Sequence, residues 1–260
     1  MILCDLHMHT TFCDGKNTPE QMILSAIDKG LKVVGLSGHS YTGIDSVFGM
    51  SKDNLQQYFD NITSLKSKYA DKIKILLGIE QDSFAPILDI NFDYKIGSVH
   101  YVLKDGNYLG VDHSEQILIT DVNKYYNGDI YSYAEDYYKQ VANVIKDTNA
   151  DIIGHFDLIT KFNEGYKLFD EANERYVNAY KKAIDELIPY GKPFEINTGA
   201  ISRGYRTAPY PSVPIMKYIK EKGGKFILSS DSHSAENISF KFDVCEQLAK
   251  EIGLSLLDTI

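Results

Sequence analysis

The stretch Cys4-Asp5-Leu6-His7-Met8-His9-Thr10-Thr11-Phe12-Cys13-Asp14-Gly15 decides the fold of this chain. The short apolar run from Ile2 to Leu6 is typical of a buried strand, and His7 and His9 follow at its end. Residues two apart in an extended chain point to the same side, so both imidazoles can bind one metal ion. Asp14 lies in the turn that follows. We therefore interpret the start of the chain as a strand that ends in metal ligands.

The rest of the chain repeats the alternation of strand and helix. A capping-box pattern at Thr18, Pro19 and Gln21 indicates the first helix. The predicted strands are 2–6, 33–37, 73–79, 94–99, 151–154, 194–197 and 225–228, and the later helices are 52–70, from about 133, 170–188, 213–222 and 236–251. We expect the stretch from Tyr101 to Tyr131 to be a long loop. This alternation favours an α/β fold with parallel strands and right-handed crossovers, and 260 residues suit one β/α barrel.

Nearly every predicted strand ends in a side chain that can bind a metal. These residues are His7, His9, Asp14, His39, Glu80, His100, His155, Asp231 and His233. Six of the seven histidines of the chain are in this set, and His113 is the exception. The carboxyl ends of parallel barrel strands meet on one face, where active sites form. We therefore expect these nine side chains to converge although they are far apart in sequence.

Imidazole and carboxylate ligands without thiolate suit Zn, Mn or Fe(II). Nine ligands are too many for one ion, whereas three ions with about three protein ligands each would keep positions open for water and substrate. Cys4 and Cys13 flank the ligands, but Cys4 precedes the strand end and Cys13 lies in a turn, so neither is expected to bind metal.

Composition and charge narrow the function classes. Hydrophobic residues make up 43% and charged residues 24% of the chain, which is ordinary for a globular protein. A net charge of -9 argues against nonspecific nucleic-acid binding, although bound metal ions can reverse the local sign for a phosphorylated substrate. Cys4, Cys13 and Cys245 form no disulfide pattern. Without a signal peptide or an apolar run of roughly 20 residues, we expect a cytoplasmic protein with no membrane partner and no obligate protein partner.

Six motifs together resemble those of the polymerase and histidinol phosphatase (PHP) family. They are His7-x-His9 with Asp14, Gly38-His39, Gly78-Ile79-Glu80, Ser98-Val99-His100, Gly154-His155-Phe156-Asp157 and Ser230-Asp231-Ser232-His233. The chain length and the Asn197-Thr198-Gly199 segment followed by arginines resemble the stand-alone histidinol-phosphatase branch. The resemblance implies a distorted seven-stranded β/α (TIM-like) barrel, with residues 1–260 forming a single PHP metal-dependent phosphoesterase domain. It also implies hydrolysis of L-histidinol phosphate to L-histidinol and phosphate in histidine biosynthesis.

The resemblance further implies a trinuclear site with a division of its ligands. One ion would bind His7, His9, Glu80 and Asp231. A second ion would bind Glu80, His100 and His155. A third ion would bind Asp14, His39 and His233. Glu80 would bridge the first two. Bridged ions lower the pKa of bound water, so we expect a hydroxide that attacks phosphorus in line, with Glu80, Asp231 and Arg203 as catalytic residues.

Substrate contacts are expected from the loops. Arg203 and Arg206 follow the strand 194–197, and a guanidinium can bind phosphate oxygens bidentately. Of the two we favour Arg203 for the phosphate. Phe48 and Tyr101 are placed to stack on the imidazole of the substrate. His113 and Glu115 could face its amine or its imidazole. For Phe48, His113 and Glu115, simple packing or solvation of the loop is at least as strong an alternative, and for Arg206 solvation is the stronger one.

Two other functions compete with histidinol phosphatase. The same metal centre would also suit a phosphotyrosine protein, a nucleotide or a nucleic-acid 3' end. The acidic charge and the absence of a basic aromatic track argue against nucleic acid, whereas a tyrosine ring would fit the same aromatic loops. A non-catalytic metal-binding protein is the other alternative, and an intact ligand set with open coordination argues against it.

Overall fold

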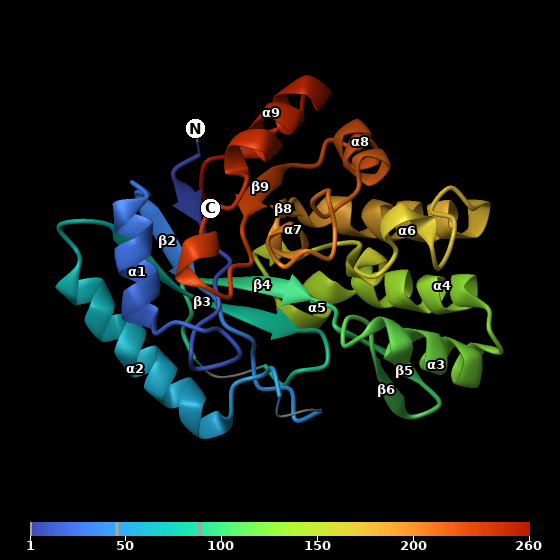
Figure 1. Cartoon of the computed structure of the whole chain (residues 1–260), viewed down its shortest axis with the longest axis horizontal. Helices are drawn as coiled ribbons and strands as arrows, with labels where there is room; N and C mark the ends of the chain where they lie inside the picture. Colours follow the sequence, from blue (N-terminus) through green and yellow to red (C-terminus); the bar gives the residue numbers. More distant parts are fainter. Residues whose placement is uncertain (1, 45–46, 88–89) are drawn as a thin grey trace.

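The computed structural model describes residues 2–44, 47–87 and 90–260 and contains one curled sheet of parallel strands (Figure 1). The strands, in their order across the sheet, are β1 (Cys4–Asp5), β2 (Val33–Leu36), β3 (Lys74–Asp82), β4 (Tyr94–Ser98), β7 (Ile152–Ile153), β8 (Phe194–Asn197), β9 (Phe226–Ser229) and β10 (Leu256–Leu257). The α/β class is therefore confirmed. The number of strands differs from the seven predicted, because β10 adds an eighth beside β9.

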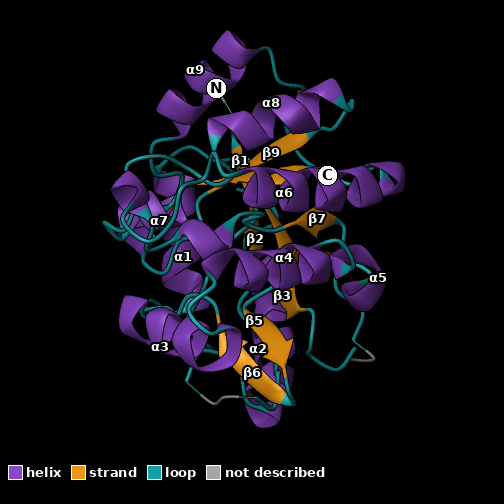
Figure 2. Ribbon diagram, turned by 90° about the vertical axis from the view of Figure 1, so that its right-hand side faces the viewer, coloured by secondary structure: helices purple, strands orange, loops and turns teal. Residues whose placement is uncertain are grey.

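Helices surround the curled sheet (Figure 1). They are α1 (Pro19–Asp28), α2 (Lys52–Lys68), α3 (Glu115–Tyr126), α4 (Ile130–Val141), α5 (Val144–Thr148), α6 (Glu174–Leu187), α7 (Gly199–Ser202), α8 (Val213–Glu221) and α9 (Phe242–Ile252), with short 3-10 turns η1 (Leu158–Thr160), η2 (Glu164–Tyr166), η3 (Ile188–Tyr190) and η4 (Ala235–Asn237). The predicted capping box at Thr18 is present. Figure 2 shows α4 and α6 packed side by side across one flank. Within the described ranges, every helix is too short or too polar to cross a bilayer.

The sheet closes only at the end where the predicted ligands lie. β9 pairs with β10 through Phe226 and Ile227, so this part of β9 is not available to β1. Beyond the strands, Met8 and Ser232 form a parallel bridge, in which the His9 amide donates to the Ser232 carbonyl at 2.8 Å. The buried Asp5 carboxylate spans the remaining gap by accepting from the Ser230 amide at 3.1 Å. The sheet is thus a half-barrel with a closed mouth.

The prediction of a long loop from Tyr101 to Tyr131 was wrong. This segment forms the hairpin β5 (Tyr101–Lys104) and β6 (Asn107–Gly110), followed by α3. Asp105 and Gly106 occupy the two-residue turn with φ values of 49° and 77°. An Asp-Gly pair is the usual solution for a turn that requires positive φ at both positions, so the hairpin signal was present in the sequence.

One tyrosine fills the interior beneath the predicted ligands. Tyr94 on β4 is buried, and its hydroxyl donates to the Leu6 carbonyl on the other side of the half-barrel. The ring lies against β2 and β3 at Gly35 and Gly78. A methyl group at Gly78 would lie 2.2 Å from Tyr94 Cζ. Because Gly78 has no side chain, β3 can pack against the Tyr94 ring and hold Glu80 in its observed position.

We expect Gly78→Ala to destabilise the protein. The added methyl group overpacks the core against Tyr94, and such overpacking typically costs about 1–3 kcal/mol. Urea unfolding followed by circular dichroism measures the change in the free energy of unfolding. A change within about 0.5 kcal/mol of wild type, the usual range for a surface substitution, would show that Tyr94 does not require this space.

Candidate metal centre

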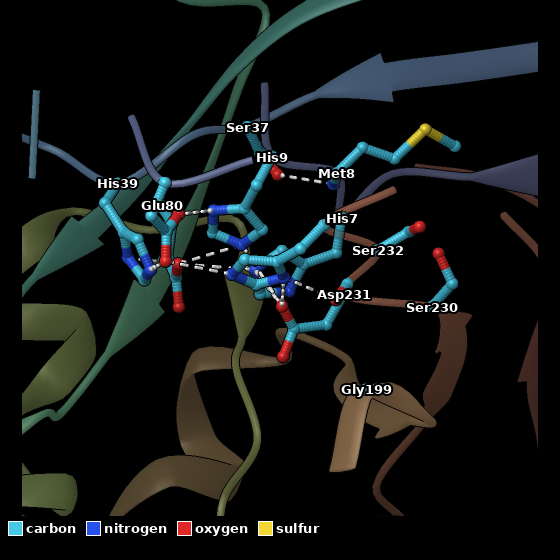
Figure 3. Close-up of polar contacts among 12 residues, drawn as sticks. His7, Met8, His9, Ser37, His39, Glu80, Gly199, Ser230, Asp231 and Ser232 are labelled. Atoms are coloured by element: carbon cyan, nitrogen blue, oxygen red, sulfur yellow. Dashed lines mark hydrogen bonds and ion pairs between the residues drawn. The ribbon is translucent and has the colours of Figure 1, made fainter. Parts of the chain in front are cut away.

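The structure brings the nine predicted ligand side chains together at the mouth of the half-barrel. Figure 3 labels five of them, which are His7, His9, His39, Glu80 and Asp231. His7 and His9 follow β1, His39 follows β2, and Glu80 lies within β3. Four more follow β4, β7 and β9, and these are His100, His155, Asp231 and His233, whereas Asp14 lies in the turn before α1. β3 ends three residues later than predicted, so Glu80 points inward from a strand rather than from a loop.

Glu80 stands at the centre of the cluster. Its Oε2 atom lies 2.8 Å from His39 Nδ1, 3.4 Å from His7 Nε2 and 3.6 Å from His9 Nε2 (Figure 3). The side chains of Glu80, His7 and His9 are all at most 1% exposed. One carboxylate oxygen therefore faces three imidazole nitrogens in the protein interior.

The second oxygen of Glu80 faces a different pair of imidazoles. Its Oε1 atom lies 2.8 Å from His155 Nε2 and 3.3 Å from His100 Nε2, and it accepts a hydrogen bond from Ser98 Oγ at 2.7 Å. The two oxygens of one carboxylate thus point to two groups of nitrogen ligands. This is the arrangement that a bridging carboxylate needs.

A third group forms around Asp14. Asp14 Oδ2 lies 3.2 Å from His233 Nε2 and 3.7 Å from His39 Nε2, and Asp14 Oδ1 lies 3.4 Å from His9 Nδ1. Asp231 Oδ1 joins the cluster at 3.1 Å from His9 Nε2 (Figure 3). His9 and His39 therefore stand between the Asp14 group and the Glu80 group.

Several atoms of the cluster fit a bound cation. His7 Nε2, His9 Nε2, Asp14 Oδ1 and Glu80 Oε2 are buried without a hydrogen-bond partner among the described residues. A buried polar atom without a partner is costly, and metal coordination would satisfy all four. Ligand atoms lie within 4.8 Å of one another in three sets: His9, Asp14, His39 and His233; His7, His9 and Glu80; His39, Glu80 and His100. The cluster can therefore hold metal.

The electrostatics of the cluster keep its carboxylates ionised. Burial would raise the pKa of Glu80, but the surrounding imidazoles lower it well below its usual range. Burial likewise opposes protonation of His7, yet Glu195, Glu80 and Asp231 raise its pKa to about 10. Burial and the charge of His9 lower the pKa of His233 to about 4. Without metal, protonated imidazoles supply the positive charge beside the carboxylates. A metal ion would replace these protons, so metal binding should release protons.

Two buried carboxylates that were not predicted hold the imidazoles in place. Glu195 Oε1 lies 2.7 Å from His7 Nδ1, and its Oε2 accepts from the His155 amide at 3.0 Å. Asp82 Oδ2 lies 3.1 Å from His100 Nδ1. Such partners fix the ring orientation of metal-binding histidines. A charged residue inside the apolar strand Phe194–Asn197 was the signal that could have identified Glu195.

We expect Glu195→Gln to weaken metal binding about tenfold to hundredfold, the usual effect of removing such a partner. Gln keeps the shape but loses the charge that orients His7. Competition with a chromophoric zinc chelator measures the affinity. Glu186→Gln, an exposed change on α6, is the control. Equal affinity of both variants and wild type would contradict the role given to Glu195.

A cavity of about 220 Å³ opens above the cluster. Its walls include the predicted residues Phe48, Tyr101, His113 and Arg203, together with Asp112, Lys161 and Tyr205, which were not predicted. Arg203 Nη2 donates to Asp231 Oδ2 at 3.1 Å, which places the guanidinium at the edge of the cluster. The His113 ring lies 5.4 Å from Phe48 and 5.7 Å from Tyr101 between centroids, so these three rings form one aromatic wall.

Arg206 and Glu115 are not brought to this cavity. Arg206 is buried behind it, where it donates to the Thr160 carbonyl at 3.1 Å and lies over the Tyr210 ring. The buried, charged Asp157 attracts it there. Glu115 begins α3 and pairs with Lys167 in a neighbouring hollow. Arg206 lies in the predicted loop after β8, whereas Glu115 lies in a helix where a loop was predicted. A position in the sequence does not determine which way a side chain points.

Comparison with known proteins agrees with this geometry. Residues 5–199 match the sequence model of the PHP domain. This chain belongs to the PHP family. Among relatives of this PHP protein, the "Probable histidinol-phosphatase" of Deinococcus radiodurans is 27% identical over 96% of this chain and 94% of that protein. The histidinol-phosphatase of Bacillus subtilis is 24% identical, with 92% of this chain and 96% of that protein covered.

A solved structure shares the fold. The histidinol phosphate phosphatase of Lactococcus lactis, determined in complex with zinc, L-histidinol and phosphate, superimposes with a TM-score of 0.69. The match covers 98% of this PHP chain and 95% of that chain at 21% sequence identity. The half-barrel described above is therefore also the fold of the Lactococcus protein.

Proposed function

We propose that this PHP protein is a metal-dependent phosphoric monoester hydrolase that converts L-histidinol phosphate to L-histidinol and phosphate in histidine biosynthesis. The observation that carries the proposal is the buried cluster of imidazoles and carboxylates, which opens into a cavity with Arg203 at its edge. The names of the relatives and the ligands in the Lactococcus structure support the choice of substrate.

The proposed cofactor is a set of three divalent ions. His7, His9, Glu80 and Asp231 would hold one, Glu80, His100 and His155 a second, and Asp14, His39 and His233 a third. The two-sided geometry of Glu80 and the grouping around Asp14 support this division. Zinc in the Lactococcus structure favours zinc, while manganese and iron suit the same ligands. When bound, the ions lower the pKa of water and neutralise phosphate oxygens.

The residues of this chain have distinct roles in the proposed reaction. Glu80 and Asp231 hold the ions, and Asp231 also directs the Arg203 guanidinium through their hydrogen bond. Arg203 binds the non-bridging phosphate oxygens, where negative charge must be neutralised in the transition state. The wall of Phe48, Tyr101 and His113 receives the imidazole of the substrate by stacking.

We further propose that residues 1–260 form one domain. β10, near the end of the chain, pairs with β9, and Cys4 Sγ lies 3.7 Å from Thr259 Oγ1. These contacts support a single domain. A cytoplasmic location stays a prediction from the sequence.

Phosphate release from three substrates tests the proposal. We expect the purified protein to prefer L-histidinol phosphate over phosphotyrosine and a nucleotide monophosphate, because the cavity combines a phosphate-binding edge with an aromatic wall. Stripping with a chelator should abolish activity, and zinc or manganese should restore it. Equal and weak cleavage of all three would leave a metal phosphoesterase but contradict the histidine-pathway assignment.

Two histidine substitutions separate metal binding from substrate binding. We expect His100→Ala to lower kcat/KM more than about a hundredfold. Loss of a residue that only hydrogen-bonds to a metal ligand already lowers activity by up to about a hundredfold. His113→Ala should raise KM but keep the metal content, because His113 belongs to the aromatic wall. Steady-state kinetics and bound-metal analysis measure both, with circular dichroism to check the fold. Unchanged turnover in His100→Ala would contradict the proposed site.

A further inference from the structure

Asp112 and Lys161 form an ion pair in the wall of the cavity. Asp112 follows β6 and Lys161 follows η1. Lys161 Nζ lies 3.0 Å from Asp112 Oδ2 and 2.9 Å from the Asp112 carbonyl oxygen. The ammonium also lies 4.9 Å from the centre of the Tyr205 ring and 5.5 Å from that of Phe162. These contacts fix Lys161 in place, and Lys161 in turn fixes one oxygen of Asp112.

Asp112 differs from the other carboxylates that line the cavity. Asp14, Glu80, Asp82 and Asp231 each lie within ion-pair distance of an imidazole of the cluster. Asp112 has Lys161 as its partner instead. In the described part of the chain, no hydrogen bond reaches Asp112 Oδ1. A carboxylate oxygen accepts up to two hydrogen bonds, so Oδ1 is available to a ligand in the cavity.

The chemistry of the proposed substrate requires such a group. In L-histidinol phosphate, an ammonium group sits on the carbon next to the ester methylene, close to the phosphate. The phosphate edge of the cavity is strongly positive once ions join Arg203, and it would repel this ammonium. The carboxylates of the cluster are committed to imidazoles and metal. Asp112 supplies a negative charge on the same cavity wall without taking one from the cluster.

We propose that Asp112 is a specificity-determining residue that binds the ammonium group of an amino-alcohol phosphate through Oδ1, with Lys161 as the residue that positions it. This inference rests on the proposed function and narrows its substrate class to phosphate esters with a neighbouring ammonium. It assigns to Asp112 the contact that the sequence had assigned to Glu115 or His113.

A pair of substrates tests the proposal with the metal-loaded protein. L-histidinol phosphate is compared with 3-(imidazol-4-yl)propyl phosphate, the same ester without the amine. We expect wild type to prefer the amino ester. Asp112→Asn should reduce the ratio of the two kcat/KM values about tenfold to hundredfold, the range for a hydrogen bond to a charged group, mainly through KM for the amino ester.

Asp136→Asn is the matched control. Asp136 pairs with Lys104 at 3.1 Å and is partly exposed like Asp112, but it does not line the cavity. This variant should keep the wild-type ratio. Calorimetric titration with L-histidinol and with 3-(imidazol-4-yl)propanol gives a second readout that does not depend on turnover, and Asp112→Asn should bind the two alcohols with nearly equal affinity. If Asp112→Asn does not fold, Lys161→Met should show a smaller loss of preference.

The outcomes separate this inference from the proposed function. A wild-type protein that cleaves neither ester contradicts both. A wild-type preference that Asp112→Asn retains, or an equal loss for both esters, overturns the role of Asp112 while histidinol phosphatase activity stands. A selective loss for the amino ester, together with weaker binding of L-histidinol alone, supports the inference.

Discussion

The buried carboxylate of Glu80 is the interaction on which the rest of the structure depends. A charge in the protein interior is very costly unless opposite charge or hydrogen bonds surround it. Five imidazoles lie within 3.6 Å of its two oxygens, and they come from segments that follow four different strands. The need to satisfy this one group therefore links β3 to both halves of the sheet. Bound cations would satisfy it more fully than protonated imidazoles can.

The half-barrel supplies the geometry that this cluster needs. Tyr94 fills the interior below Glu80, and the bridge between Met8 and Ser232 joins the two ends of the sheet beside the ligands. The buried Asp5 carboxylate stabilises that joint by accepting hydrogen bonds from the backbone amides of Ser230 and Ser239. The sheet is closed only at the Met8–Ser232 bridge, and this closure brings Asp231 next to His9. The cavity, its aromatic wall and the Asp112–Lys161 pair then stand above a rigid base.

The sequence predicted seven of the eight strands of the parallel sheet and the nine clustered side chains, because both follow from local pattern and from the parallel topology. It did not identify Glu195, Asp82 or Asp112. Each is one carboxylate among many, and its role depends on a partner far away in sequence: His7, His100 or Lys161. Arg203 and Arg206 show the same limit, since Arg203 donates to Asp231 at the cavity whereas Arg206 donates to the Thr160 carbonyl outside it. The missed hairpin at Asp105 and Gly106 is different, because its turn signal was local.

The number of metal ions per chain tests the central claim most directly. Protein purified from cells grown with zinc, manganese and iron can be analysed by inductively coupled plasma mass spectrometry, with the protein concentration set by amino-acid analysis. Three divalent ions per chain, removed together with activity by a chelator, is the result that the nine-ligand cluster predicts. A fully active protein that contains no bound metal, or a single ion, would contradict it.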